Sequence, residues 1–112
     1  MQSVTNNSGI LLVLSTCPPE VAKMLAEMLV SSKLAACVNI VPAVTSVYRW
    51  QGQVENGTEA LLVIKCTASN YATLEQRLRS EHPYELPEII TVPDIGGLPE
   101  YLQWVSDPEQ TT

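Results

Sequence analysis

Positive charge and long hydrophobic runs are both scarce in this chain. It carries 6 basic residues against 12 acidic ones, a formal net charge of −6, which argues against a surface that binds nucleic-acid phosphates. The longest apolar run near the N-terminus, Ile10 to Leu14, is too short for a membrane span or a signal peptide, and no basic segment precedes it. The sequence therefore predicts a cytoplasmic protein whose partners include neither a membrane nor a nucleic acid.

Cysteine, histidine and catalytic motifs are also few. The three cysteines, Cys17, Cys37 and Cys66, are an odd number without CxxC spacing, which indicates reduced thiols and no disulfides. The single histidine, His82, has no serine or cysteine partner at a spacing typical of a catalytic triad. No GxSxG, P-loop or dinucleotide-binding motif is present. We therefore expect a protein that is not an enzyme.

What the chain does contain is a long β-ribbon, predicted from Ala35 to Thr67. Its two limbs meet at Gln51-Gly52, where glycine can take the positive φ of a tight hairpin. Pro42 removes a hydrogen-bond donor, so a β-bulge or an edge strand is expected there. Limbs of roughly fifteen residues extend about 50 Å at strand rise. We expect the tip, Tyr48 to Val54, to project and to contact another chain.

Periodicity predicts the remaining elements. They are a strand at Ile10 to Ser15, a helix from Pro18-Pro19 to near Lys33, a helix capped by Ser69 or Asn70 and ending at His82, a strand at Glu88 to Ile95 and a helix from Pro99 to about Ser106. The first helix is expected to bury Val21, Met24, Leu25, Met28 and Leu29, and the second to bury Tyr71, Leu74 and Leu78. Residues 1–8 and 107–112 are predicted to be disordered tails around one domain at 9–106.

The resulting order predicts an α+β fold. The β-α-β-β-α-β sequence plus a C-terminal helix is the split βαβ, or ferredoxin-like, pattern, and right-handed crossovers place both long helices on one face of the sheet. The other face would be bare, although Ile10 to Leu14 and Ala60 to Ile64 are apolar on both sides. Charged residues make up only 16% of the chain, which is few for a lone small monomer. Self-association is the simplest cover for that face.

Chemistry is most plausible in the segment Glu81 to Glu88, where two prolines hold an imidazole, a phenol and carboxylates together. His82 is either a metal ligand, with Glu81 or Glu85 supplying oxygen, or a helix-terminal histidine that bonds the last carbonyls of its helix. Cys17 lies where the first strand meets the first helix, so it is either a thiol whose pKa the helix N-terminus lowers or a small buried packing residue.

Three further candidates lie on or near the ribbon. A two-residue turn without a bulge would set Cys37 opposite Cys66, whereas any bulge moves them apart. Lys65 alternates with buried residues, so it either snorkels or lines a cleft as a cation for an anionic ligand, together with Tyr84 and Glu88.

Five motifs carry a resemblance to a known family: KLAACVN at 33–39, SVYRWQG at 46–52, IKC at 64–66, HPY at 82–84 followed by Pro87-Glu88, and YLQW at 101–104. From about residue 9 to 106 the chain resembles the CutA family of divalent-cation tolerance proteins. The resemblance implies a ferredoxin-like, cytoplasmic homotrimer similar in architecture to PII signalling proteins, with a link to copper and other divalent metals. High thermal stability is expected in turn, because a trimer interface adds apolar burial and couples folding to association.

The resemblance also implies a copper site, formed by a cysteine at the end of the first strand and two histidines before the Pro-Tyr. In this chain His82 matches the second of those histidines, but Glu81 stands at the position of the first. Ser15 stands at the position of the strand cysteine, and Cys17 could serve as a substitute ligand. Because thiolate is what selects Cu(I), these departures favour a harder or weaker cation site. The alternatives are a PII-like sensor that binds an anionic ligand between subunits, and a scaffold whose HPYELPE loop is only a joint.

Overall fold

The computed structural model describes residues 8–110; the predicted tail residues 1–7 and 111–112 lie outside that range. Its elements are β1 (Ile10–Cys17), α1 (Pro19–Ser31), β2 (Cys37–Trp50), β3 (Gln53–Thr67), α2 (Ala68–Glu81), β4 (Ile90–Val92), α3 (Pro99–Ser106) and a short 3-10 helix, Pro108–Gln110. The predicted β-α-β-β-α-β order with a C-terminal helix is confirmed, as are the bounds of α3.

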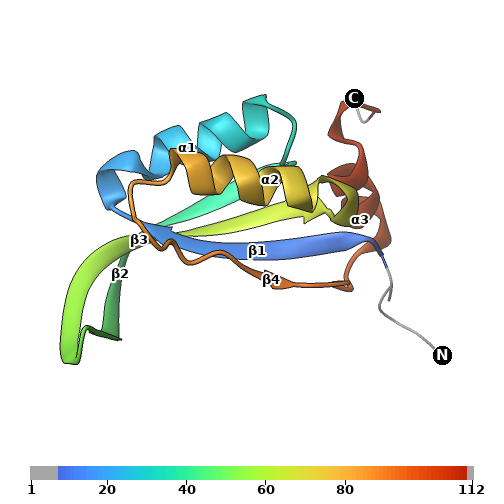
Figure 1. Cartoon of the computed structure of the whole chain (residues 1–112). Coiled ribbons are helices and arrows are strands. Elements are labelled where there is room, and N and C mark those ends of the chain that lie inside the picture. The colour runs from blue at the N-terminus through green and yellow to red at the C-terminus, as the bar shows by residue number, and fades with distance from the viewer. Residues whose placement is uncertain (1–7, 111–112) are drawn as a thin grey trace.

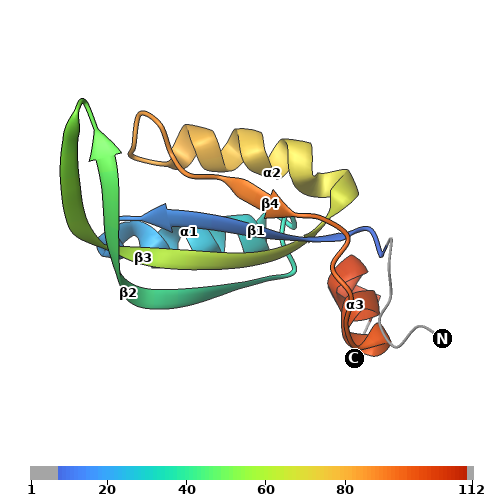
Figure 2. The ribbon, with the colours of Figure 1, turned by 90° about the horizontal axis from the view of Figure 1, so that it is seen from below.

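The four strands form one antiparallel sheet in the order β2-β3-β1-β4. Helices α1 and α2 lie side by side on one face, and the ribbon of β2 and β3 extends beyond the body and bends away from them (Figure 1). This is the ferredoxin-like arrangement that the sequence predicts. The opposite face is uncovered over most of its length (Figure 2).

The core lies between the sheet and the two helices. Alternate strand residues face the helices and are fully buried; among them are Val13, Leu62 and Ile64, each 0% exposed. Helix α2 contributes Leu74 and Leu78 as expected, but α1 buries Ala22, Leu25, Ala26 and Leu29. Met24 is 47% exposed, so its predicted place in the core is wrong. The small side chains of Ala22 and Ala26 are buried instead.

The ribbon has the predicted turn and the predicted bulge. Gln51 and Gly52 both have positive φ, at 52° and 80°, which matches the right-handed twist of the strands. The pairing shifts by one residue between Val41 and Val44, around Pro42. Cys37 therefore lies opposite Lys65 and not opposite Cys66. All three cysteines are free thiols.

The bulge also changes which side chains share a face. Before it, Cys37, Asn39 and Val41 pair with residues on the uncovered face; after it, the even-numbered residues from Val44 to Trp50 take that side. An unshifted strand would turn Tyr48 and Trp50 to the other side.

Two local predictions are corrected. Strand β4 spans only Ile90–Val92, because Pro87 and Pro93 bracket it and the Glu88 carbonyl accepts a hydrogen bond from Ser15 Oγ at 2.6 Å. The N-cap of α2 is Thr67, whose hydroxyl accepts from the Asn70 N–H at 3.2 Å. Strand β3 continues to that residue, so the helix begins directly after the strand.

Within the described range, residues of both predicted tails make contacts with the domain. Ser8 Oγ donates to the Ile95 carbonyl at 2.8 Å. At the other end Pro108–Gln110 form a 3-10 turn, and Glu109 pairs with Lys33 at 3.1 Å.

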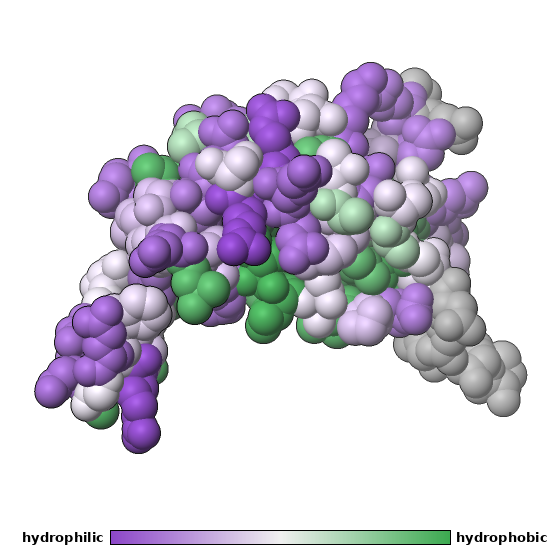
Figure 3. Space-filling model, in the orientation of Figure 1, coloured by the Kyte–Doolittle hydropathy of each residue, from purple (hydrophilic) through white to green (hydrophobic). Residues whose placement is uncertain are grey.

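The uncovered face is apolar across all four strands. Figure 3 shows hydrophobic residues along the lower edge of the body, beside the projecting ribbon. Their cross-strand pairing places on this face Leu12, Leu14, Val41, Leu61, Val63, Ile90 and Val92. Ile90 and Val92 are 51% and 45% exposed, so the face that the sequence predicts to be bare is bare in a single chain. No helix within residues 8–110 is long and apolar enough to cross a membrane.

Candidate functional site

Near the predicted site lies a groove of about 750 Å³, where the ribbon bends away from the sheet. The loop at 82–88 forms its other wall; the ribbon rises beside this loop in Figure 2. We call it the acidic groove, and its lining residues are Thr16, Ser46, Val47, Tyr48, Trp50, Glu59, Pro83, Tyr84, Glu85, Leu86 and Glu88.

The loop is held against the end of β1 by His82. Pro83 disfavours helical backbone at the preceding residue, so α2 ends at Glu81 and His82 is its extended C-cap. The imidazole is 7% exposed. Its Nδ1 accepts the Tyr84 N–H at 3.1 Å, so Nε2 carries the proton and donates to the Thr16 carbonyl at 2.8 Å. Both ring nitrogens therefore take part in the fold of the loop.

A predicted metal site at Glu81, His82 and Cys17 needs these side chains to converge. In this conformation the His82 ring has no lone pair free, and Glu81 faces outward and pairs with Arg77 at 3.5 Å. Cys17 is fully buried; burial first, and then the charges of Glu59 and Glu20, raise the pKa of its thiol. Within residues 8–110, no three His, Cys, Asp or Glu side chains are grouped as metal ligands.

For His82 and Cys17, these observations favour the structural role over the metal-binding or reactive-thiol role. His82 is a helix-terminal histidine, although its ring bonds the Thr16 carbonyl of β1 and not the last carbonyls of its own helix. Cys17 packs as a small buried residue among the core side chains. Of the two alternatives for this residue, a thiol pKa lowered by the helix N-terminus is not supported, because desolvation raises the pKa.

Tyr84 connects the loop to the ribbon. Its hydroxyl donates to Glu59 Oε2 at 2.7 Å, and its ring lies 4.8 Å from that of His82. Burial, followed by the bond to Glu59, raises the pKa of the Tyr84 phenol. The phenol therefore stays protonated as a donor, and Glu59 contributes a negative charge to the groove.

Lys65 does not join this site within one chain. It lies on the uncovered face opposite Leu12 and Cys37, and its ammonium donates to Asn39 Oδ1. It lies six positions after Glu59 along β3, a distance of about 20 Å at strand rise. The predicted cleft of Lys65, Tyr84 and Glu88 is thus not formed by a single chain, and only the last two line the groove.

The sequence predictions miss Glu59, Tyr48 and Trp50 as groove residues. The alternation of the first ribbon limb already groups Tyr48 with Trp50 on one face. Pairing the limbs through the turn then sets Val44 opposite Glu59, so the signal for all three is the hairpin register. Nothing in the sequence indicates that the 82–88 loop lies against that face.

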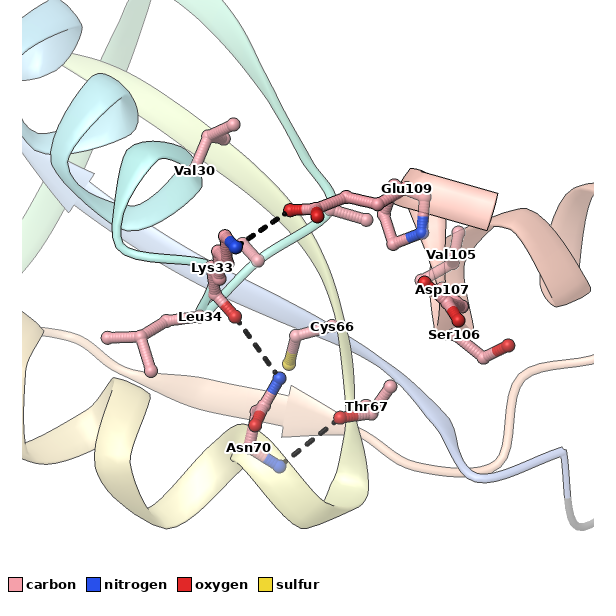
Figure 4. A pocket seen from close by; sticks show the side chains of 13 residues that line it. Val30, Lys33, Leu34, Cys66, Thr67, Asn70, Val105, Ser106, Asp107 and Glu109 are labelled. Atoms are coloured by element: carbon pink, nitrogen blue, oxygen red, sulfur yellow. Dashed lines mark hydrogen bonds and ion pairs between the residues drawn. The ribbon is translucent and has the colours of Figure 1, made fainter. Parts of the chain in front are cut away.

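A second cavity, of about 470 Å³, lies where α1, α2 and the C-terminal segment meet (Figure 4). Lys33 reaches across it to Glu109 at 3.1 Å, and the Asn70 side-chain amide donates to the Lys33 carbonyl at 3.3 Å. Both charges of that ion pair are mainly exposed. This cavity is a junction between elements, held by bonds within the chain.

The comparisons with known proteins agree on one family. The sequence profile of the CutA1 divalent ion tolerance protein matches residues 11–108. A CutA homolog from Xenopus laevis is 50% identical over 93 residues, which are 82% of this chain and 62% of the relative. The divalent-cation tolerance protein CutA of Thermus thermophilus is 48% identical over 96 residues, 85% of this chain and 93% of the relative.

Solved structures give the same result. The divalent cation tolerance protein from Thermus thermophilus superposes with a TM-score of 0.84 at 46% identity, covering 88% of this chain and 96% of that one. A protein described as PII-like, the apo CutA of Nostoc, has a TM-score of 0.81 at 34% identity, covering 86% and 93%. With the ferredoxin-like sheet, the projecting ribbon and the His82-Pro83-Tyr84 loop in place, this chain belongs to the CutA1 divalent ion tolerance protein family.

Proposed function

We propose that this protein acts in divalent cation tolerance as a non-enzymatic homotrimer that binds its cation in the acidic groove. The observation that carries the proposal is the charge of that groove, whose described lining residues include Glu59, Glu85 and Glu88 and no lysine or arginine. These carboxylates are not grouped as one ligand set within a single chain, so we expect the cation to bind one or two of them together with water. Carboxylate oxygens suit hard or borderline divalent cations, whereas Cu(I) is selected by thiolate. Because the Cys17 thiol is buried and protonated, it supports a hard or borderline divalent cation and not Cu(I).

Copper, as Cu(II), is the cation that we propose first, with Zn(II) as the alternative. A site at Glu81, His82 and Cys17 stays a prediction. Metal binding there requires the imidazole to give up its bond to the Thr16 carbonyl or to the Tyr84 N–H, so we expect any such site to be weak.

The test is calorimetric titration of the reduced protein with Cu(I), Cu(II) and Zn(II). Glu85→Gln/Glu88→Gln removes two groove charges, His82→Ala removes the imidazole, and Glu20→Gln/Glu27→Gln removes two exposed charges elsewhere. We expect stoichiometric Cu(II) binding that the first variant weakens about tenfold and the control leaves unchanged. Loss in His82→Ala alone, with the fold intact, would place the cation at His82 instead. No binding stronger than millimolar in the unchanged protein would contradict the proposal.

The homotrimer is supported by the uncovered apolar face and by the exposed ribbon tip, where Val47 and Val54 are 69% and 72% exposed. The number three comes from the family resemblance. Val63→Lys puts a charge on the uncovered face and should reduce the assembly to monomers in light scattering, whereas Ala72→Lys on the exposed surface of α2 should not. A monomeric unchanged protein would refute the proposal.

Thermal stability is proposed to depend on the same association. Because assembly stabilises only the folded chain, Tm should rise with protein concentration under reversible conditions. A Tm that is independent of concentration would contradict this.

A cytoplasmic location is supported by the three free thiols, which suit a reducing compartment. Rapid alkylation of intact cells followed by mass spectrometry checks it, because all three should be found reduced.

A PII-like sensor for an anionic ligand would need Lys65 of another copy beside the groove. A melting shift with an anion that Lys65→Ala abolishes would support that alternative.

A further inference from the structure

A buried thiol borders the second cavity. Cys66 lines the cavity of about 470 Å³ between α1, α2 and the C-terminal segment, yet it is 1% exposed. In Figure 4 its sulfur lies between the end of α1, which carries Lys33, and the segment that carries Glu109. Burial raises the pKa of this thiol to about 11, so it stays protonated and unreactive in this conformation.

The walls of the cavity are not held equally firmly. Leu34 and Ala35 belong to the main hydrophobic core between the sheet and the two long helices. On the other side, Val105 belongs to a separate small cluster, and the chain after it is exposed at Asp107 and Glu109. A segment with few buried contacts opens at a lower free energy than the whole domain. The wall after Val105 is therefore the one that can open locally.

An exposed ion pair ties this wall to α1. We call residues 107–110 the C-terminal strap. Lys33 Nζ lies 3.1 Å from Glu109 Oε2, and the two side chains are 74% and 67% exposed, so salt screens the pair. Lys33 has a positive φ of 65°, a conformation that glycine adopts at lower cost. A lysine at this position thus carries backbone strain, and its ammonium is the group that reaches the strap.

We propose that the C-terminal strap is a lid over Cys66, which the Lys33–Glu109 ion pair keeps closed, and that breaking this pair exposes the thiol to small electrophiles. The lid lies beside the two long helices, on the side of the sheet opposite the uncovered face, and at the other end of the molecule from the ribbon (Figure 1). It is therefore independent of the proposed cation site and of the surface that another copy is expected to cover.

The experiment measures alkylation of the reduced, assembled protein by iodoacetamide at constant pH, with each cysteine followed separately by peptide mass spectrometry. The Cys66 thiolate displaces iodide and forms a thioether, so the rate reports on access to the thiol. Cys17, which is 0% exposed in the main core, is the internal reference, because it reacts when that core opens. Light scattering and circular dichroism verify the assembly and the fold of each variant.

In the unchanged protein we expect Cys66 to react faster than Cys17, because opening of the strap alone is sufficient. Lys33→Gln and Glu109→Gln should each speed the reaction of Cys66 about threefold. Ending the chain after Asp107 removes most of the strap and should speed it about tenfold or more. The rate of Cys17 should not change in these variants.

A charge exchange separates the ion pair from a general loss of stability. Lys33→Glu/Glu109→Lys should restore the slow reaction of Cys66, and Glu100→Gln, at an exposed glutamate of α3, should leave it unchanged. Salt at about 1 M should speed the reaction in the unchanged protein but not in Glu109→Gln. Equal rates for Cys66 and Cys17 in every variant, an equal acceleration by Glu100→Gln, or a charge exchange that stays fast would overturn the proposal.

Discussion

The two faces of the sheet are built from the same strands but are completed differently. On the helix side Leu62 and Ile64 are fully buried within one chain. On the other side their neighbours Leu61 and Val63 remain partly exposed, and Ile90 is half exposed. One face is thus stabilised by folding alone, whereas the other gains its stabilisation only when a further surface covers it.

The largest expected effect separates two adjacent leucines. Leu62→Ala should lower the free energy of unfolding by about 3 kcal/mol, since it empties space in a closed core. Leu61→Ala, on the uncovered face, should cost about 1 kcal/mol in the isolated chain and weaken association as well. Urea unfolding measured at several protein concentrations distinguishes the two. Equal effects at low concentration would show that the uncovered face is already closed.

Burial on the helix side also predicts a dependence on pH. Burial raises the pKa of the Cys66 thiol from 9.0 to about 11, so the folded chain keeps a proton that the unfolded chain loses. The associated stability is fully present below about pH 9 and is lost as the pH rises toward 11, by about 2 to 3 kcal/mol. Urea unfolding across that range measures it. Cys66→Ala should flatten this slope, and an unchanged slope would exclude Cys66 as its cause.

His82 links the two regions by holding the groove loop to β1. His82→Ala leaves the Thr16 carbonyl and the Tyr84 N–H without partners, so unfolding should become easier by about 2 kcal/mol. Its neighbour Glu81 is the matched control, because the loss of its exposed ion pair with Arg77 should cost under about 0.5 kcal/mol. Similar losses in the two variants would argue against a structural role for the imidazole.

Ser15 makes the smaller contribution to the same joint. Its buried hydroxyl donates to the Glu88 carbonyl at 2.6 Å, and Ser15→Ala should destabilise the fold by about 1 kcal/mol. Ser80→Ala removes a hydroxyl that bonds the Arg77 carbonyl on an exposed part of α2, and it should have almost no effect. Thermal unfolding of both variants at one protein concentration makes the comparison.

Much of the fold follows from local patterns. The Gln51-Gly52 turn, the bulge at Pro42 and the bounds of α3 were predictable, because each depends on residues close together in the chain. The errors occur where packing overrides a pattern. Met24 follows the helical stripe yet is exposed, whereas Ala22 and Ala26 are buried. Strand β4 is short because Pro87 and Pro93 flank it and the Glu88 carbonyl accepts a hydrogen bond from the Ser15 side chain, so these residues do not pair with the backbone of β1.

The candidate site was predictable only in part. The composition of the 81–88 segment marks it as the chemically unusual stretch, and Tyr84 and Glu88 do line the groove. The orientation of the His82 ring was not predictable, because its Nε2 donates to the carbonyl of Thr16, which lies 66 positions away in the chain. The predicted cleft of Lys65, Tyr84 and Glu88 lies between subunits, and the register of β3 shows only that Lys65 is far from Tyr84 within one chain.

The sequence by itself determined the family, the order of the elements and the two-sided apolar strands that require a partner surface. These properties depend on short-range periodicity and on motifs, which survive in any conformation of the chain. Only the tertiary structure decided that the groove is acidic and aromatic and that the imidazole is fully bonded. Those results arise from the bulge in β2, which rotates Tyr48 and Trp50 to the side of Glu59, and from the docking of a distant loop against them.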